Sequence, residues 1–213
     1  MIGQRLKSII GLLAIILAIR GLSTSEQTVK LKTYHDPQYG VSFQYPTAWT
    51  ADPKMGFYLL TNILIRPNGF LDDALMKVGL KGPMNPDHLD HGPYSGTNLD
   101  GIEFVYTVLP QTKAESCYER LKYDGVDEDN HKQTNVVIHG VEFTRVIGGD
   151  AGLGHGADRD MYGAYRGGRC YLFEAGIHTW NGGDPKFMAS KQINKLRAQL
   201  TAVMRSVKIE GQK

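Results

Sequence analysis

The chain has 213 residues, of which 41% are apolar, and it carries 24 Lys and Arg against 22 Asp and Glu. This length and apolar content suit one globular domain with a substantial core. Three of the basic residues and none of the acidic ones lie in residues 1–25, so the remainder holds 21 basic against 22 acidic side chains, a net charge of −1. A near-neutral domain lacks the electrostatic footprint of a nucleic-acid-binding protein and holds no polybasic patch for a membrane surface.

The N-terminus has a pattern typical of a secretory signal peptide. Basic side chains precede an apolar or small run over residues 8–19, and small residues follow it. As a helix this run would reach about 18 Å, short of the roughly 30 Å hydrocarbon core of a membrane. We therefore expect residues 1–25 to direct export and residues 26–213 to form a single domain, periplasmic or secreted. Arg20 directly after the run is atypical, which leaves open an uncleaved anchor in the inner membrane through residues 5–20, or a buried helix.

In the first half of the chain, alternating apolar residues bounded by turn-forming residues predict strands. Asp36, Pro37 and Gly40 form a turn signal between the first two strands, and Trp49 is expected to fill the core. Three prolines and three glycines in residues 82–97 predict a long loop. The expected strands are 29–35, 39–46, 57–65, 74–80 and 101–109, and the expected helix is 113–122.

The second half predicts two antiparallel hairpins and a terminal helix. The first hairpin turns at His139-Gly140 and the second at Gly167-Gly168. Asp184 followed by proline predicts the start of a long amphipathic helix. Because strands dominate and tight turns join them, we expect the α+β class, with a central antiparallel sheet flanked by helices. The expected strands are 135–138, 141–147, 161–166, 169–177 and 206–210, and the expected helix is 186–205.

Cys117 and Cys170 are the two cysteines of the chain. In an oxidising compartment we expect them to pair, closing a loop of about 54 residues that is worth roughly 4 kcal/mol in the chain-entropy model. A reactive thiol would need a nearby histidine or cation, and the segments AESCYERL and GGRCYLF hold no histidine. Two inert buried thiols are the remaining alternative.

Several segments together resemble the PsbP-like family. They are YHDPQYGVSFQYPTAW at residues 34–49, GIEFVYT at 101–107, GGRCYLFEAGI at 167–177, and the terminal helix running into SVKI at 206–209. This family includes the extrinsic subunit of the photosynthetic oxygen-evolving complex, a Ran-binding nuclear import factor and exported bacterial proteins, whose branch shares a cysteine near each of the two positions here. The resemblance implies an α/β/α sandwich around a central antiparallel sheet and no common catalytic centre.

The glycine-rich stretch GGDAGLGHGADRD, residues 148–160, joins the two hairpins and is the nearest approach to a functional motif. It lacks the Lys-Ser/Thr pair of a nucleotide-binding glycine loop and the acidic spacing of an EF-hand. We expect a flexible crossover with glycines at positive φ; the alternatives are a cation site or a loop that binds a ligand or partner. The residues that would carry such a site are Asp150, His155, Asp158 and Asp160.

The sequence DHLDH at residues 87–91 offers a second candidate site. On one helical turn His88 and His91 would share a face. With a carboxylate such as Asp87 or Asp90, or with His155, brought near, they could hold a divalent metal, zinc or manganese, through nitrogen and oxygen ligands. Solvated polar residues in a proline-rich loop are the plainer interpretation, and no other cofactor is expected.

Tyr162, Tyr165, Tyr171 and Trp180 on the second hairpin are expected to pack in the core or as cross-strand pairs, with a recognition strip as the alternative. Ser95 lacks the G-x-S-x-G spacing of a hydrolase nucleophile, and no catalytic motif is recognised. We therefore expect a non-enzymatic exported domain that binds or stabilises an unknown envelope protein and meets a membrane only through its N-terminal segment. A small-ligand or metal-binding protein and a hydrolase are the alternatives.

Overall fold

A computed structural model of the chain describes residues 29–52, 74–81, 94–110, 112–123, 132–152, 154–181 and 186–210. The chain divides into a unit of residues 1–30 and a unit of residues 31–213, and the fold belongs to the second unit. The expected signal segment, the expected strand at 57–65 and the DHLDH sequence lie outside the described residues.

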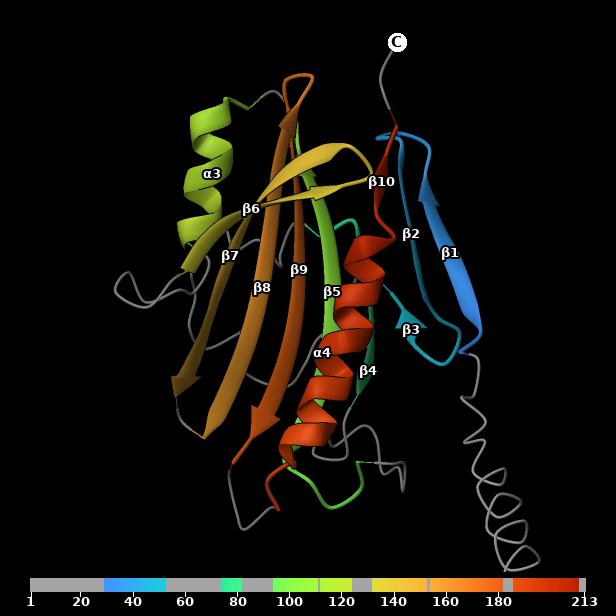
Figure 1. Cartoon of the computed structure of the whole chain (residues 1–213), viewed down its shortest axis with the longest axis vertical. Helices are drawn as coiled ribbons and strands as arrows, with labels where there is room; N and C mark the ends of the chain where they lie inside the picture. The colour runs from blue at the N-terminus through green and yellow to red at the C-terminus, as the bar shows by residue number, and fades with distance from the viewer. Residues whose placement is uncertain are drawn as a thin grey trace, which may run out of the picture. The chain divides into compact units, whose positions relative to one another are not determined.

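The described residues form two antiparallel sheets and two helices (Figure 1). In chain order the elements are β1 (Leu31–Asp36), β2 (Val41–Pro46), β3 (Thr50–Ala51), β4 (Met76–Lys81), β5 (Leu99–Leu109), α3 (Ala114–Tyr123), β6 (Lys132–Ile138), β7 (Val141–Gly152), β8 (His155–Arg166), β9 (Arg169–Trp180), α4 (Ser190–Arg205) and β10 (Lys208–Ile209). The small sheet has the order β1-β2-β10, and the large sheet has the order β3-β4-β5-β9-β8-β7-β6. All these strand pairs are antiparallel. The α+β class is confirmed.

The turn between β1 and β2 has the chemistry that the sequence predicts. One carboxylate oxygen of Asp36 accepts hydrogen bonds from the backbone N–H groups of Gln38 and Tyr39, at 2.9 and 3.2 Å. Gly40 has a φ of +64°, which glycine adopts without steric cost. The side chain of Asp36 therefore stabilises the turn that sets the register of the two strands.

The glycine-rich stretch 148–160 is not a flexible crossover; it forms the far end of a long hairpin between β7 and β8. The ladder of backbone pairs continues to Gly152 and His155. A Cβ on Gly149 would collide with a carbonyl group of the neighbouring strand. Among the described glycines of this stretch, Gly154 in the turn has the one positive φ, +85°. The glycines here therefore mark the close approach of two strands. The prediction of a flexible loop, which rested on composition alone, is wrong.

The helix expected at 113–122 is confirmed as α3, but α4 begins at Ser190, four residues after the expected start. Tertiary hydrogen bonds hold the preceding segment extended. The backbone N–H of Asn98 donates to the carbonyl of Lys186 at 2.9 Å, and the N–H of Met188 donates to Oδ1 of Asn98 at 3.0 Å. The predicted start near Asp184 is therefore wrong, because these contacts outweigh the local helix signal.

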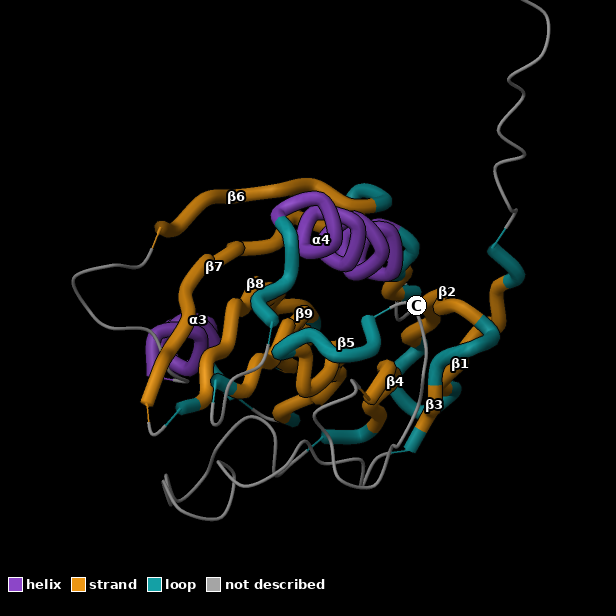
Figure 2. Tube along the Cα trace, turned by 90° about the horizontal axis from the view of Figure 1, so that it is seen from below, coloured by secondary structure: helices purple, strands orange, loops and turns teal. Residues whose placement is uncertain are grey.

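One face of the large sheet is covered by α4 (Figure 2). Leu196, Leu200 and Val203 of this helix are buried in one hydrophobic core with Phe104 of β5 and Phe173 of β9. Successive side chains of a strand point to opposite faces, so the even-numbered core residues of β5 and the odd-numbered ones of β9 define this "α4 face". Trp49 is also in this core, as expected.

The opposite face, the "α3 face", is covered in part by α3. Leu121 of this helix packs in a second cluster with Val105, Met161 and Leu172. Gly163 allows the helix to approach the sheet, since a Cβ there would lie 2.7 Å from Cδ1 of Leu121. Neither described helix has the length and apolar character needed to cross a membrane.

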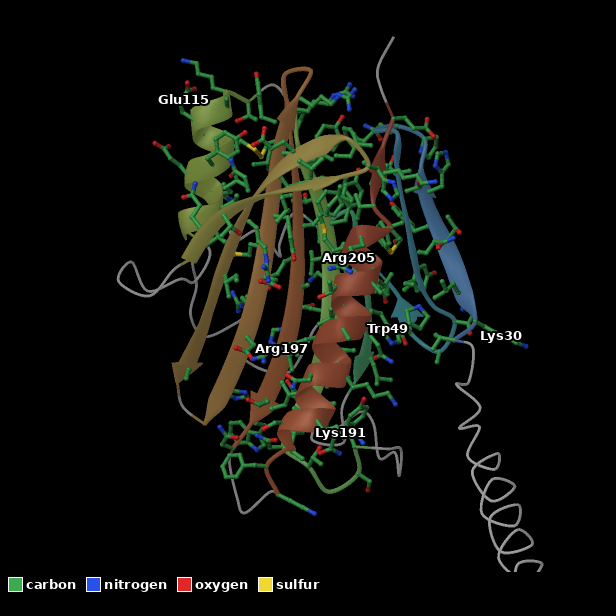
Figure 3. The ribbon with its side chains drawn as sticks, in the orientation of Figure 1. Lys30, Trp49, Glu115, Lys191, Arg197 and Arg205 are labelled. Atoms are coloured by element: carbon green, nitrogen blue, oxygen red, sulfur yellow. A yellow bond between two sulfur atoms is a disulfide. The ribbon has the colours of Figure 1, made fainter. Side chains whose placement is uncertain are left out.

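The tip of the β6–β7 hairpin reaches the C-terminal end of α4, where Arg205 lies (Figure 3). Nε2 of His139 in the tip is 3.0 Å from the carbonyl oxygen of Arg205. A carbonyl oxygen only accepts, so Nε2 carries the hydrogen. The last carbonyl groups of a helix have no partner within it, and this hydrogen bond provides one while it fixes the hairpin tip to α4.

Candidate binding groove and buried charge cluster

The candidate residues of the 148–160 stretch do not converge on one site. Arg145 donates three hydrogen bonds to Asp160, from Nη2 to Oδ2 at 2.7 Å and to Oδ1 at 2.9 Å, and from Nε to Oδ1 at 3.1 Å. Asp158 pairs with Arg197, which extends from α4 (Figure 3). Both carboxylates therefore neutralise arginines on the α4 face, where they join neighbouring elements.

His155 lies next to an aromatic ring, and Asp150 is located by its backbone pairing. The ring of His155 packs against Trp180 with centroids 4.2 Å apart, and Asp150 pairs through its backbone with Ala157. Within the described ranges, no group of three or more His, Cys, Asp or Glu side chains could hold a metal ion. The proposed site at 87–91 lies outside those ranges and stays a prediction.

The aromatic residues of the second hairpin divide between core and surface. Tyr162 and Tyr171 are buried in the core, as expected. Burial, together with the charge of Asp160, raises the pKa of Tyr162 to about 12, so this phenol stays protonated. Tyr165, in contrast, is 37% exposed.

Cys117 and Cys170 form the expected disulfide, and both are buried on the α3 face. The bond joins α3 to β9. Cys170 lies directly opposite Tyr165 of β8, and Tyr118 follows Cys117 in α3. The disulfide therefore links the backbone segments that carry the two tyrosines.

Strands β7 and β8 separate before either of them ends. Their ladder stops at the pair Thr144 and Gly163, whereas β8 continues along β9 to Arg166 and β7 continues along β6 to Val141. In Figure 1 the tip of the β6–β7 hairpin turns away from the end of β8. A groove of about 600 Å³ lies among these strand ends and α3.

We name this hollow the tyrosine groove. It combines exposed aromatic rings with neutral and charged polar groups, and Nδ2 of its asparagine donates to Oε1 of its glutamate at 3.0 Å. Its lining holds one carboxylate, one guanidinium, and neither histidine nor cysteine. The principal side chains are Tyr118 of α3, Gln133 and Asn135 of β6, Glu142 of β7, and Tyr165 and Arg166 of β8.

A cluster of charged side chains is buried on the α3 face around Gly176 of β9. Glu103 of β5 and Arg159 of β8 lie directly opposite Gly176 on its two sides. Glu174 and His178 lie two residues before and after it on the same strand. Residues in these positions share one face of a sheet, so the four side chains gather over the glycine.

The side chains of this charge cluster are closely paired. Nε2 of His178 lies 2.8 Å from Oε1 of Glu103, and Nε of Arg159 lies 3.5 Å from Oε1 of Glu174. Lys77 of β4 is buried near Glu103 and acts on it through its charge. The side chains of the two pairs are only 0–15% exposed, so the cluster is closed to solvent and the tyrosine groove is the better candidate for binding.

The pairing keeps both members of the His178–Glu103 pair ionised. Burial alone would raise the pKa of Glu103, but the charge and hydrogen bond of His178, with the charges of Lys77 and Arg159, hold it below its ordinary value. Burial likewise acts to lower the pKa of His178, and the charge and hydrogen bond of Glu103 outweigh it, so this pKa is raised. Opposite charges at this distance favour the imidazolium–carboxylate form.

Replacing Gly176 by alanine is expected to lower the free energy of unfolding by about 1–3 kcal/mol. The new Cβ would lie 2.9 Å from Nε2 of His178 and would push the imidazole away from Glu103. Urea unfolding followed by circular dichroism measures the change. Gly152→Ala is the matched control, because it is also a strand glycine and no atom lies within 4 Å of its Cβ position. Equal stability of the two variants would contradict this role of Gly176.

No protein-family model matches the chain, and no curated protein matches it. Among solved structures the chain is similar to cyanobacterial PsbP (CyanoP) from Synechocystis sp. PCC 6803, with 10% identity and a TM-score of 0.45 over 90% of this chain and 99% of that one. It is also similar to LpqN, involved in cell envelope biogenesis of Mycobacterium tuberculosis, with 8% identity and a TM-score of 0.46 over 86% of this chain and 92% of that one.

A protein of unknown function from Pseudomonas aeruginosa is a third such structure, with 10% identity and a TM-score of 0.41 over 85% of this chain and 99% of that one. A PsbP protein is thus among the solved structures to which this chain is similar, in line with the resemblance noted in the sequence. Because the identities are at most 10% and the TM-scores lie below 0.5 for these three, the likeness is one of fold and says nothing about a partner or a site.

Proposed function

We propose that the chain is a non-enzymatic exported domain that binds an envelope partner through the tyrosine groove. In this proposal residues 1–25 direct export or anchor the chain in the inner membrane. Residues 26–213 then fold outside the cytoplasm as one domain of the PsbP-like α/β/α type. The observation that carries the proposal is the open groove itself, one wall of which is attached to the sheet by a disulfide.

Two properties of the molecule support this proposal. A buried disulfide suits an oxidising compartment, since such bonds rarely persist in the cytoplasm. The groove is concave and lined by aromatic rings with a few polar groups, the usual make-up of a binding site.

Site-specific photo-crosslinking tests the proposal in the organism that encodes the chain. With a photoreactive amino acid at Tyr165 of the full-length protein, we expect an adduct of one discrete size in the envelope fraction. Tyr118→Ala should reduce its yield by about tenfold, which corresponds to roughly 1.4 kcal/mol of binding energy. The same photoreactive residue at Lys195, exposed on α4 across the sheet, is the control.

The proposal fails if Lys195 gives the same adduct, or if Tyr165 gives none. Recovery of the chain in the cytoplasm with both thiols free would contradict the export part of the proposal. The crosslinking result therefore tests the groove as the binding site, and the state of the thiols and the cell fraction test the compartment.

A further inference from the structure

We infer that the tyrosine groove binds a neutral oligosaccharide, a chain of hexose units whose C–H faces lie on the tyrosine rings and whose hydroxyl groups bind the polar side chains. The inference rests on the proposed binding function and names the class of ligand. Four features of the groove support it: its aromatic rings, its polar groups, its charge balance and the disulfide that links the backbone beside its two tyrosines.

The two tyrosines offer flat platforms of the size of a sugar ring. Tyr118 and Tyr165 are 36% and 37% exposed, whereas Tyr106 and Tyr171 in the core are 0% and 2% exposed. A tyrosine presents an apolar face and a polar tip, and it loses little side-chain entropy on binding. Pyranose rings with equatorial hydroxyls have apolar C–H faces and polar edges, so the two surfaces are complementary.

The polar groups of the groove match pairs of adjacent hydroxyls. Asn135 donates one N–H to Glu142; the amide has a second N–H and an oxygen, and the carboxylate has a second oxygen. Gln133, two residues from Asn135 on β6, adds another amide. Pairing of β6 with β7 fixes the backbone of all three. A sugar hydroxyl both donates and accepts, so neighbouring hydroxyls can bind to such a row.

The composition of the groove disfavours other common ligands. The guanidinium of Arg166 is balanced by the carboxylate of Glu142, which leaves no net positive charge for a phosphate-rich ligand. Val141 is the one aliphatic side chain of the lining, too little to hold an acyl chain. The volume, about 600 Å³, falls within the range of roughly 300–1,000 Å³ that small-ligand sites occupy.

The backbone positions that carry the two tyrosines are linked through the disulfide and the strand pairing. Tyr118 follows Cys117, Cys117 is bonded to Cys170, and Cys170 pairs with Tyr165 across β8 and β9. A site ordered before binding loses less conformational entropy when the ligand arrives. Two aromatic side chains on linked backbone segments can therefore contact more than one unit of a glycan chain.

Titration of the full-length, disulfide-bonded protein with chitotetraose, cellotetraose and maltotetraose tests the inference by calorimetry. We expect at least one of them to bind with a Kd below about 1 mM. Tyr118→Ala and Tyr165→Ala should each weaken that binding by about tenfold or more, as expected of central aromatic contacts. Asn135→Ala should weaken it too. Tyr39→Ala, the same change in the β1–β2 turn, should leave the Kd unchanged, and urea midpoints establish that each variant is folded.

Absence of binding by all three sugars at about 5 mM, well above the expected Kd, would overturn the inference. So would equal binding by wild-type protein and the two groove variants. If the sugars fail while the crosslink at Tyr165 still captures an envelope protein, the saccharide inference is wrong and the proposed function stands. If both fail, the groove has neither role.

Discussion

Removal of the disulfide by the double substitution Cys117→Ala/Cys170→Ala is expected to lower the free energy of unfolding by about 4 kcal/mol. The bond joins residues 53 apart in the sequence, and in the chain-entropy model a loop of this length restricts the unfolded chain by that amount. Since 1 kcal/mol corresponds to roughly 2–4 °C for a domain of this size, Tm should fall by about 8–16 °C. Urea unfolding and thermal unfolding under oxidising conditions measure both quantities.

Reduction of the wild-type protein provides the control for the disulfide prediction. Reductant should bring the urea midpoint of the wild type to that of the double variant and leave the variant unchanged. A loss below about 1 kcal/mol would contradict the prediction, because it would place the bond at the low end of the known range. The double variant should also bind the tetrasaccharide more weakly, although neither cysteine lines the groove.

The Glu103→Gln substitution is expected to lower the free energy of unfolding by about 3 kcal/mol or more, the usual loss when one partner of a buried ion pair is removed. Glutamine keeps the shape of glutamate, so the loss reports charge. His178 would then be buried near Lys77 and Arg159 with Glu174 as the remaining carboxylate of the cluster, so the buried positive charge would no longer be balanced. Urea unfolding near pH 6 measures the loss.

Glu115→Gln is the matched control for this second prediction. Glu115 is exposed in the first turn of α3 (Figure 3), and its replacement should change stability by at most about 0.5 kcal/mol, as for most surface positions. If Glu103→Gln were as mild as Glu115→Gln, the buried pair would not stabilise the fold.

The His178–Glu103 pair also gives stability a defined dependence on pH. The pKa of Glu103 in the folded state is below the ordinary 4.5, so its contribution is present above pH 4.5 and is lost as pH falls through the folded value. The pKa of His178 is above the ordinary 6.5, so its contribution is complete below pH 6.5 and is lost as pH rises through the folded value. The pair therefore stabilises the fold most between pH 4.5 and pH 6.5. In a series of urea unfolding experiments at different pH, Glu103→Gln should reduce both the loss of stability at low pH and the loss at high pH.

Features whose signals lie close together in the sequence were predictable. The Gly167-Gly168 turn and α3 follow from a few neighbouring residues, and the disulfide follows from two cysteines in a chain that is expected to be exported. The stretch 148–160 was wrongly predicted as a loop. Its glycines are needed because the backbone of the paired strand lies so close, and composition does not reveal that pairing. The start of α4 was misplaced for a similar reason, since Asn98 holds the preceding segment from a distant part of the chain.

The groove and the charge cluster depend on pairing between distant segments and were not predicted. Glu103 and His178 are 75 residues apart, and only the register of β5 and β9 brings them together. One signal was present in the sequence: Glu103 in GIEFVYT and Glu174 in YLFEAGI each interrupt an apolar strand, which indicates a buried partner. No local sequence pattern indicated the groove, because it forms where the pairing of β7 with β8 stops.

The first and last parts of the domain meet in one sheet, where Val41 pairs with Ile209, and His139 ties the hairpin beside the groove to Arg205 at the end of α4. A chain that stops before α4 would already contain the groove tyrosines, Tyr118 and Tyr165, and both cysteines. It would lack the helix that holds the hairpin in place. The position of the hairpin beside the groove therefore depends on α4, which follows every groove-lining residue in the sequence.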